Sequence, residues 1–383
     1  MKNLKEYLVE GLFDDVDKLE GKKGLANNLK LLKKEITDWI INHTEERVYK
    51  NKLSIDMNTN PPTVDYNGNI KLEKSVTSLT NDGLFQWGEV SGDFKCQACT
   101  RLTSLEGAPK KVGKDFSCMW CVILTSLEHC PEEIGGGFNC NQCASLTNLK
   151  GCPKEIKGLF QCDKCESLET LEGAPEKVGG DFYCSHCYSL KNLEGAPKEV
   201  EGTFHCGSCE SLKSLKGAPK VIGEDFNCES CKSLKSLEGC PKEIGRYFDC
   251  SYCNSLTNLK GAPEKVGTDF NCYHCKSLKT LEGSPKKVNE GFYCSFCDSL
   301  ETLEGAPETV GGNFTCYGDK SLKSLKGAPK ETGRFDCSHC PSLKSLEGAP
   351  KKVGADFRCR NCGTQFTEDD VKKVSNVKKR IDC

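Results

Sequence analysis

Hydrophobic positions recur along most of the chain with a period of 22 residues. Each copy opens with Phe-x-Cys-x-x-Cys, continues through Ser-Leu-x-x-Leu-x-Gly-Ala-Pro, and closes with a stretch such as Lys110-Lys111-Val112-Gly113. The opening Phe stands at positions 94, 116, 138, 160, 182, 204, 226, 248, 270, 292, 314, 335 and 357. One step, from Phe314 to Phe335, is 21 residues, and twelve of the thirteen copies keep both cysteines. A cysteine-free stretch from Leu72 to Leu79 is interpreted as an entry coil.

The alternation inside each copy predicts its local structure. Phe and the first Cys are two residues apart, so both side chains face the same side of a strand. Gly-Ala-Pro predicts a change of direction, because Gly permits positive φ while Pro fixes its φ and removes a donor. The Pro-x-x-Val-Gly stretch is typical of an extended return leg. A unit of 22 residues suits one turn of a solenoid, so we expect residues 72–362 to form stacked coils joined by parallel strands.

The N-terminal flank, residues 1–71, lacks the repeat and is expected to form a small α/β cap. Leucines at helical spacing predict a helix over residues 3–20. Apolar residues of the next segment predict a firmer amphipathic helix that ends near Asn42: Leu29, Leu32, Ile36, Trp39 and Ile40. The ranges 52–57 and 64–72 are predicted to be short strands, with Asn67-Gly68 as a hairpin turn.

The C-terminal flank, residues 363–383, is predicted to be a helical cap. Thr367 followed by three acidic residues is a good helix start. Val371, Val374, Val377 and Ile381 would form one apolar side. Because a solenoid needs polar-backed lids over its open ends, we expect both flanks to serve that purpose.

Charge and composition narrow the functional class. The formal net charge is −2, from 53 Lys and Arg against 55 Asp and Glu, and no basic block favours nucleic acid or an anionic membrane. No apolar run approaches the ~18 residues of a membrane span, and no secretory segment is recognised. We therefore expect a protein of the reducing cytoplasm, whose 29 cysteines are free thiols or metal ligands rather than disulfides.

The repeat resembles the leucine-rich repeat, L-x-x-L-x-L-x-x-(N/C)-x-x-L. Residues 182–190 match its last nine positions, with Phe182 and Cys184 at two Leu sites and Cys187 at the Asn/Cys ladder position. The trailing L-x-x-L-x-G-A-P resembles repeat arrays of tailed-bacteriophage and gut-bacterial proteins, although their ladder residue is often Asn. The segment MKNLKEYLVEGLFDDVD resembles leaders on tailed-phage proteins. The resemblance covers residues 72–362 and implies a right-handed, mainly β, leucine-rich-repeat-like solenoid that serves as an interaction surface without catalysis, in a bacterial host's cytoplasm or on a virion.

Two interpretations of the cysteine pairs stay open. In the first, which we favour, the first Cys fills the core beside Phe and the second meets the backbone of a turn. Cys130, Cys152 and Cys240 support it, because they stand where other copies carry the Ala of Gly-Ala-Pro. In the alternative, adjacent pairs bind zinc through four sulfurs about 3.8 Å apart. The candidate ligands are Cys96, Cys99, Cys118, Cys121, Cys140, Cys143, Cys162, Cys165, Cys184, Cys187, Cys206 and Cys209. A thioredoxin-type redox site is disfavoured, because no helix is predicted to follow the pairs.

Function is expected on the outward face of the strands. The residues on either side of the first Cys vary from copy to copy while the inward positions repeat, which suits a recognition surface. The candidate partner-binding residues are Tyr183, His205, Asn227, Asn271, Tyr273, Tyr293 and Tyr317. Six scattered histidines and no phosphate-binding loop predict that the chain is not an enzyme. We predict a scaffold for a protein partner, with no cofactor, and with a zinc-binding array as the alternative.

Overall fold

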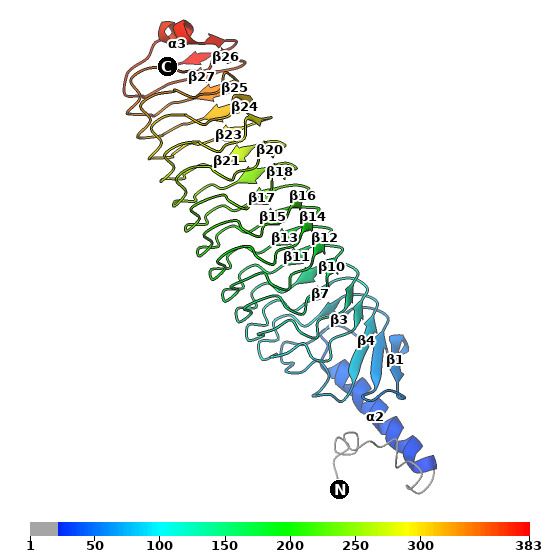
Figure 1. Ribbon diagram of the computed structural model, residues 1–383. Helices are drawn as coiled ribbons and strands as arrows, with labels where there is room; N and C mark the ends of the chain where they lie inside the picture. Colours follow the sequence, from blue (N-terminus) through cyan, green and yellow to red (C-terminus); the bar gives the residue numbers. More distant parts are fainter. Residues whose placement is uncertain (1–21) are drawn as a thin grey trace. The chain divides into compact units, whose positions relative to one another are not determined.

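The computed structural model describes residues 22–383. The chain divides into two compact units: residues 1–162 with 173–175 form unit 1, and residues 163–172 with 176–383 form unit 2. Within each unit, successive coils place their short strands side by side (Figure 1). The fold is therefore the predicted mainly β solenoid. The helix predicted over residues 3–20, and with it the leader, lies outside the described residues.

Unit 1 begins with the predicted amphipathic helix. Helix α2 spans Lys22–Asn42 and buries Leu32, Ile36 and Ile40. Trp39 meets Phe85 edge to face, with ring centroids 5.4 Å apart. A short 3-10 helix, η2, follows at Lys50–Lys52. The apolar stripe of α2 is thus packed against the first coil, as expected of a cap.

The strands that follow α2 differ from the prediction in one respect. Strand β1, Leu53–Asp56, pairs antiparallel with β2, Thr63–Tyr66. The predicted hairpin at Asn67-Gly68 is wrong: β2 pairs with β4 and β3 pairs with β5, so this turn is a corner between two strand columns. Parallel pairing with the next coil outweighs the local turn preference.

Unit 1 contains two parallel strand columns. The Phe column consists of β3 Ile70–Lys71, β5 Phe94–Lys95, β7 Phe116–Ser117, β9 Phe138–Asn139 and β11 Phe160–Gln161. The return column consists of β2, β4 Gln86–Val90, β6 Lys111–Val112, β8 Glu133–Ile134 and β10 Glu155–Ile156. Phe94 pairs with Phe116, and Val90 with Val112, so equivalent residues stack in register.

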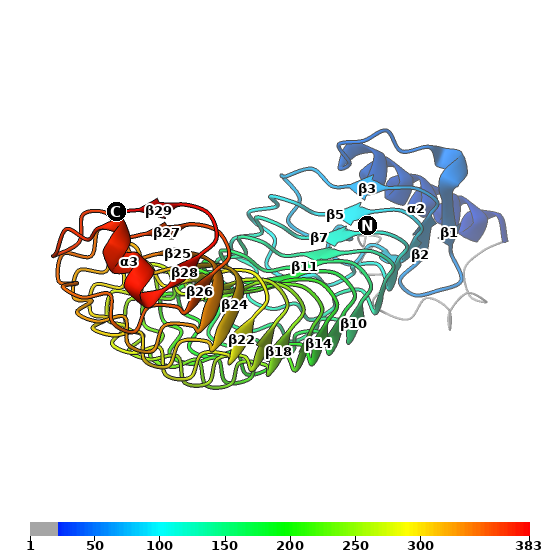
Figure 2. The ribbon, with the colours of Figure 1, turned by 90° about the horizontal axis from the view of Figure 1, so that it is seen from above.

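Unit 2 repeats this arrangement over more coils. Its Phe column consists of β13 Phe182–Tyr183, β15 Phe204–His205, β17 Phe226–Asn227, β19 Phe248–Asp249, β21 Phe270–Asn271, β23 Phe292–Tyr293, β27 Phe357–Arg358 and β29 Ile381–Asp382. Its return column consists of β12 Lys177–Val178, β14 Glu199–Val200, β16 Val221–Ile222, β18 Glu243–Ile244, β20 Lys265–Val266, β22 Lys287–Val288, β26 Lys352–Val353 and β28 Asn376–Val377. Strands β24 Thr309–Thr315 and β25 Glu331–Asp336 run through both columns. Figure 2 shows the two columns on different sides of the coils.

The core of each coil is built from the same six side chains. In one coil they are Phe248, Cys250, Cys253, Leu256, Leu259 and Val266, none more than 3% exposed. The Phe rings stack along each unit, for example with centroids 5.0 Å apart between Phe248 and Phe270. The inward direction predicted for Phe and the first Cys is confirmed. Each coil buries its apolar side only against its neighbours, so stability depends on stacking.

The turn after the second Leu favours glycine, which most coils carry there, while His129 takes its place in one coil with a φ of 65°. Gly195 has a φ of 89°, in the region that other residues avoid. A Cβ atom there would also lie 2.5 Å from the backbone nitrogen of Glu172. Both the chain direction and the close approach of adjacent coils therefore explain the repeated Gly.

The C-terminal flank forms one more coil rather than one long helix. Helix α3, Glu368–Val374, begins at Thr367 with the predicted cap: Asp370 donates its backbone N–H to Thr367. The helix then ends, and β28 and β29 add a strand to each column. The prediction that Val377 and Ile381 continue the apolar side of the helix was wrong. If the helix continued, the backbone groups at the strand edges of the preceding coil would stay unpaired. Strands β28 and β29 form hydrogen bonds with these edges instead.

Charged side chains form rows on the other sides of the coils. In unit 2, Lys191 lies 2.7 Å from Glu169, Lys326 lies 2.7 Å from Glu304 and Lys265 lies 2.6 Å from Glu243. Each pair joins adjacent coils at exposed positions, where solvent screening leaves only a small contribution to stability. Among residues 22–383, no helix is long and apolar enough to cross a membrane.

Candidate functional site

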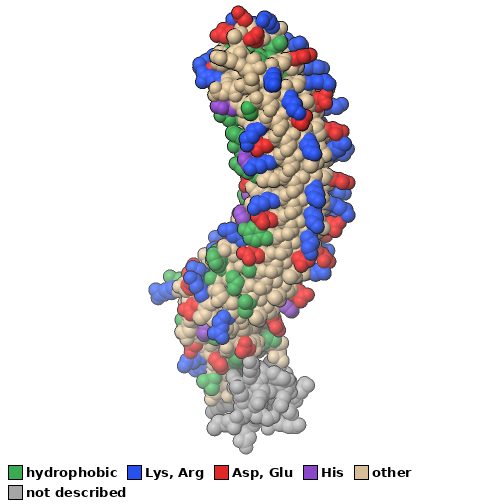
Figure 3. Space-filling view, turned by 90° about the vertical axis from the view of Figure 1, so that its left-hand side faces the viewer, with side chains coloured by type: hydrophobic (Ala, Val, Ile, Leu, Met, Phe, Trp, Pro, Cys, Tyr) green, Lys and Arg blue, Asp and Glu red, His purple; other side chains and the backbone are tan. Residues whose placement is uncertain are grey.

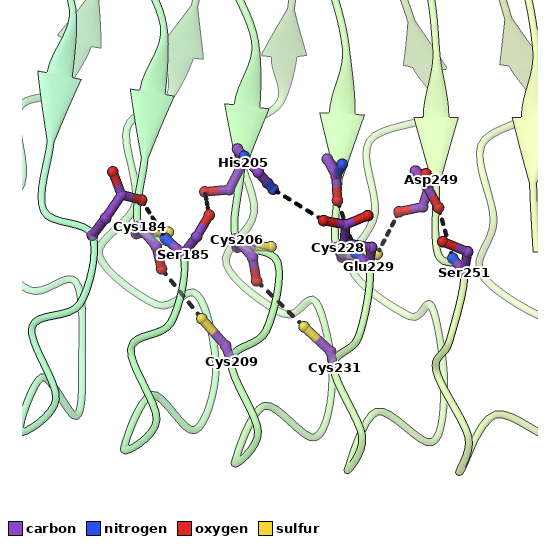
Figure 4. Close-up of polar contacts among 12 residues, drawn as sticks. Cys184, Ser185, His205, Cys206, Cys209, Cys228, Glu229, Cys231, Asp249 and Ser251 are labelled. Atoms are coloured by element: carbon purple, nitrogen blue, oxygen red, sulfur yellow. Dashed lines mark hydrogen bonds and ion pairs between the residues drawn. The ribbon is translucent and has the colours of Figure 1, made fainter.

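The second cysteine of most pairs takes part in a row of thiol hydrogen bonds inside the coils, while Cys99 at the start of the row donates to the carbonyl of Glu73. In this row, the Sγ of the second cysteine donates to the carbonyl oxygen of the first cysteine of the preceding coil, as from Cys209 to Cys184 at 3.2 Å and from Cys231 to Cys206 at 3.3 Å (Figure 4). The same bond recurs from Cys121, Cys143, Cys253, Cys275, Cys297, Cys340 and Cys362, at 3.1 to 3.3 Å. The predicted contact of this cysteine with the backbone is confirmed.

The first cysteine forms a second row that points the other way. Its Sγ donates to the backbone of the following coil, from Cys228 to the carbonyl of Asp249 at 3.3 Å and from Cys250 to that of Asn271 at 3.4 Å. The sulfur atoms therefore link neighbouring coils in both directions. This role goes beyond the apolar filling predicted from the sequence.

Burial disfavours the thiolate form at many of these cysteines, although a hydrogen bond with Cys96 lowers the pKa of the Cys121 thiol and one with Cys337 lowers that of Cys362. Burial raises the pKa of the Cys206, Cys228 and Cys231 thiols well above the ordinary value, because a thiolate is poorly solvated there. Zinc binding requires thiolates, whereas each ladder thiol uses its proton to bond a carbonyl. In the part of the chain that the structure describes, no group of three or more His, Cys, Asp or Glu side chains is arranged to hold a metal ion. The zinc alternative stays a prediction, and it requires that these thiols release the protons that they donate to carbonyl oxygens.

One coil carries a carboxyl group in place of the ladder thiol. Asp319 is fully buried, and its Oδ1 accepts the backbone N–H of Cys297 at 2.6 Å. Its Oδ2 is buried without a hydrogen-bond partner. Burial raises the pKa of the Asp319 carboxyl well above its usual range. The core therefore favours the neutral form of this carboxyl.

The outward residues of the Phe column are fixed by links between coils. In several coils an Asp precedes the Phe and accepts a backbone N–H of the next coil, as Asp225 does from Tyr247 at 3.0 Å and Asp269 from Gly291 at 2.8 Å. Side chains add further links: the Asn271 amide donates to Asp249 at 3.1 Å. These links preorganise the surface, so little side-chain freedom is lost when a ligand contacts it.

The corner before each ladder cysteine projects a further row of side chains. The residue there has positive φ, for example 58° at Tyr252, 58° at His274 and 57° at Phe296. A residue with left-handed backbone ends the strand here. Its side chain points outward, beside the residues that follow the first Cys of each pair. In unit 2 this row brings aromatic residues next to the predicted tyrosines.

Aromatic side chains from several coils of unit 2 meet on this face. Ring centroids lie 5.5 Å apart for Tyr252 and Tyr273, 5.4 Å for Tyr273 and Phe296, and 5.4 Å for Phe296 and Tyr317. They adjoin an open pocket of about 460 Å³. We call it the aromatic pocket, and its lining is Tyr247, Asn271, Tyr273, Tyr293, Ser295, Phe296, Thr315, Tyr317 and Asp336. Figure 3 shows hydrophobic and histidine side chains along one edge of unit 2 and charged side chains along the other.

The structure brings four of the seven predicted residues together. Tyr273, Tyr293, Tyr317 and Asn271 all line the aromatic pocket. The other three, Tyr183, His205 and Asn227, lie on earlier strands of the same column and do not line it. All seven are half-buried.

The three remaining residues have fixed positions of their own. The Tyr183 hydroxyl donates to Asp181 at 2.9 Å, and Asn227 accepts the backbone N–H of Glu229 at 2.8 Å. His205 lies 4.0 Å from Glu229, and burial lowers the pKa of its imidazole. His205 is therefore neutral at pH 7, and its imidazole adds little positive charge to this part of the face.

The sequence reasoning missed several residues of the pocket. Ser295, Thr315 and Asp336 lie in the variable columns but were not selected, because aromatic character guided the choice. Tyr247 lies outside those columns. It stands where six of the other coils carry Asp, as at Asp225 and Asp269, and an aromatic residue at this position was the available signal.

The chain was compared with known proteins. No family model matches it, and the search of curated proteins gave no match. Among solved structures, a leucine-rich repeat protein from Bacteroides ovatus is similar, with 15% sequence identity and a TM-score of 0.46. The alignment covers 88% of this chain and 91% of that chain.

Proposed function

We propose that the chain is a non-enzymatic scaffold that binds a protein partner through the outward face of the Phe column in unit 2. The observation that carries the proposal is the gathering of aromatic side chains from four coils around one pocket, on a frame whose buried positions repeat. Tyr residues are enriched where binding energy concentrates in interfaces. A variable surface on a constant frame is how repeat proteins form extended recognition sites.

The geometry favours a macromolecular partner over a small molecule. The aromatic pocket is open and shallow, whereas small-molecule sites enclose most of the ligand surface. Half-buried side chains continue along the column from Tyr183 through Asn227 to the pocket. A protein segment lying across the strands would contact several coils at once. We place this encounter in a reducing compartment such as the cytoplasm, where the buried thiols keep the protons that they donate.

Site-specific photo-cross-linking tests the proposal. A benzophenone amino acid at position 293 or 317 is expected to give one discrete cross-linked protein in cells that make the chain. The same group at Lys326, on the charged side of the coils, is the matched control and is expected to give none. After the captured partner is purified, Tyr293→Ala and Tyr317→Ala should each weaken its binding by about 30-fold, the effect of losing an interface hot spot.

Two results would contradict the proposal. One is a partner that cross-links equally well from position 326. The other is a purified partner whose affinity changes less than twofold in both Tyr variants. Circular dichroism of each variant confirms that the coils remain folded, because both tyrosines lie outside the core.

A further inference from the structure

We infer that the aromatic pocket receives a cationic side chain, lysine or arginine, of the protein partner. This inference rests on the proposed function and adds the chemistry of the group that the partner inserts. Three features of the pocket support it. The lining is aromatic, the nearby carboxylates form no ion pair with any described Lys or Arg, and the neutral polar groups are hydrogen-bonded to their neighbours.

The aromatic lining attracts positive charge. Tyr273, Tyr293, Phe296 and Tyr317 contribute four rings from neighbouring coils. Tyr273 and Phe296 meet edge to face, with an interplanar angle of 70°, so the rings around the pocket differ in orientation. A guanidinium or ammonium group within about 6 Å of a ring centroid is drawn to the electron-rich face.

Carboxylates at the pocket lack cationic partners. Asp336 lines the pocket, and its Oδ1 accepts the backbone N–H of Ser338 at 3.0 Å. Two more carboxylates adjoin the lining: Asp249 accepts the hydroxyl of Tyr247 at 2.9 Å, and Asp269 accepts that of Tyr293 at 3.3 Å. Among residues 22–383, no Lys or Arg forms an ion pair with these three carboxylates, whereas rows of Lys–Glu pairs balance the charge on the other sides of the coils.

The nearest arginine is directed elsewhere. Arg358 is the register partner of Asp336 on the adjacent strand. Its guanidinium lies 3.5 Å from Asp356, which Arg334 also approaches at 3.4 Å. Asp336 therefore keeps a negative charge that a cation of the partner can complement.

The neutral polar groups of the pocket are largely occupied by one another. The Asn271 amide donates to the Tyr247 hydroxyl at 2.9 Å as well as to Asp249. The hydroxyls of Ser295 and Thr315 share a hydrogen bond of 2.8 Å. A neutral ligand such as a sugar needs several free hydrogen-bonding groups, and these bonds leave few. The aromatic rings and the Asp336 carboxylate remain available, which favours a cation.

Matched small probes test the inference without knowledge of the partner. We would titrate the protein with Nα-acetyl-arginine methylamide and with its neutral isostere, Nα-acetyl-citrulline methylamide, and follow binding by saturation-transfer NMR. Methyl α-glucoside serves as the neutral sugar probe. The arginine probe is expected to bind about tenfold more tightly than the citrulline probe, because only the charged group gains the ring and carboxylate attraction.

Variants then locate the binding. Asp336→Asn keeps the shape and the acceptor for Ser338 and is expected to reduce the preference for arginine about threefold, as for a partly exposed charge pair. Tyr317→Ala is expected to reduce it about fivefold through loss of one ring. Tyr188→Ala removes an exposed tyrosine outside the pocket and should leave the preference unchanged.

Several results would overturn the inference: equal binding of the arginine and citrulline probes, stronger binding of the glucoside, or an unchanged preference in both pocket variants. The result is separable from that of the cross-linking experiment. A partner captured at positions 293 and 317 without arginine preference would leave the proposed function standing and reject the cation. Selective arginine binding, together with a partner that does not contact this face, would support a cation site in the pocket and reject the proposed function.

Discussion

Replacing Phe248 with alanine is expected to lower the free energy of unfolding by about 3–5 kcal/mol, the usual cost of removing a buried aromatic ring. The Phe248 side chain is fully buried, and its ring lies between those of Phe226 at 5.6 Å and Phe270 at 5.0 Å. Removing it leaves a cavity that both neighbouring coils line. Because each coil contacts only its neighbours, the damage should concentrate there.

Urea unfolding measures the loss, and amide hydrogen exchange locates it. Exchange should accelerate most in β17, β19 and β21. Lys265→Ala is the control, because it removes an exposed, solvent-screened ion pair with Glu243 and should leave the free energy of unfolding almost unchanged. A Phe248→Ala protein within 1 kcal/mol of the unchanged chain would show that the Phe stack does not hold the coils together.

Replacing Asp319 with cysteine is expected to raise the free energy of unfolding at pH 7 by about 1–3 kcal/mol, the cost of a buried polar group left unsatisfied. The cysteine restores the thiol that other coils carry at this position. Asp319 is buried, and its Oδ2 lacks a partner. An ionised Asp319 carboxylate is therefore less stable in the folded protein, where it is removed from water, than in the unfolded chain.

The gain should depend on pH with a defined sign. Burial raises the pKa of Asp319, so the folded protein retains this proton to higher pH than the unfolded chain does. The stability contributed by the neutral carboxyl is fully present below the unfolded pKa of about 4 and is lost as the pH rises through the folded pKa. The advantage of Asp319→Cys should therefore be small at pH 4 and larger at pH 7.

Urea unfolding at both pH values measures this difference. Asp319→Asn is the control, since it keeps the shape but removes the titration, and its stability relative to Asp319→Cys should not change with pH. A gain for Asp319→Cys that is equal at pH 4 and pH 7, or that is absent at both, would contradict the assigned role of the buried carboxyl.

The fold was predictable because each feature is repeated many times. One Phe-x-Cys strand is a weak signal, but identical spacing in successive copies forces equivalent residues into register, and the structure pairs Phe226 with Phe248 and Phe248 with Phe270. The cap at Thr367 was also predictable, since its chemistry is local. The end of α3 at Val374 was not, because it depends on pairing with strands of the preceding coil.

The candidate site was predictable only in part. Alternation along a strand showed which residues face outward, and it placed Tyr273, Tyr293 and Tyr317 on one face. The positive φ at Tyr252 and His274 was not evident, because left-handed backbone at residues of these types has no clear sequence pattern. The contact of these corner residues with the strand residues therefore emerged only from the structure.

Residue-resolved alkylation of the native protein, with and without a zinc chelator, tests most directly whether the sulfur atoms fill the coils and leave the outward positions free. Only Cys130, Cys152, Cys240, Cys362 and Cys383 reach solvent among the free cysteines, so these five are expected to react, while the others stay protected in both conditions until the protein is unfolded. Rapid native labelling of the other paired cysteines, those apart from Cys362, would contradict the inward rows of thiols. Labelling that begins only after the chelator is added would show instead that a metal holds them.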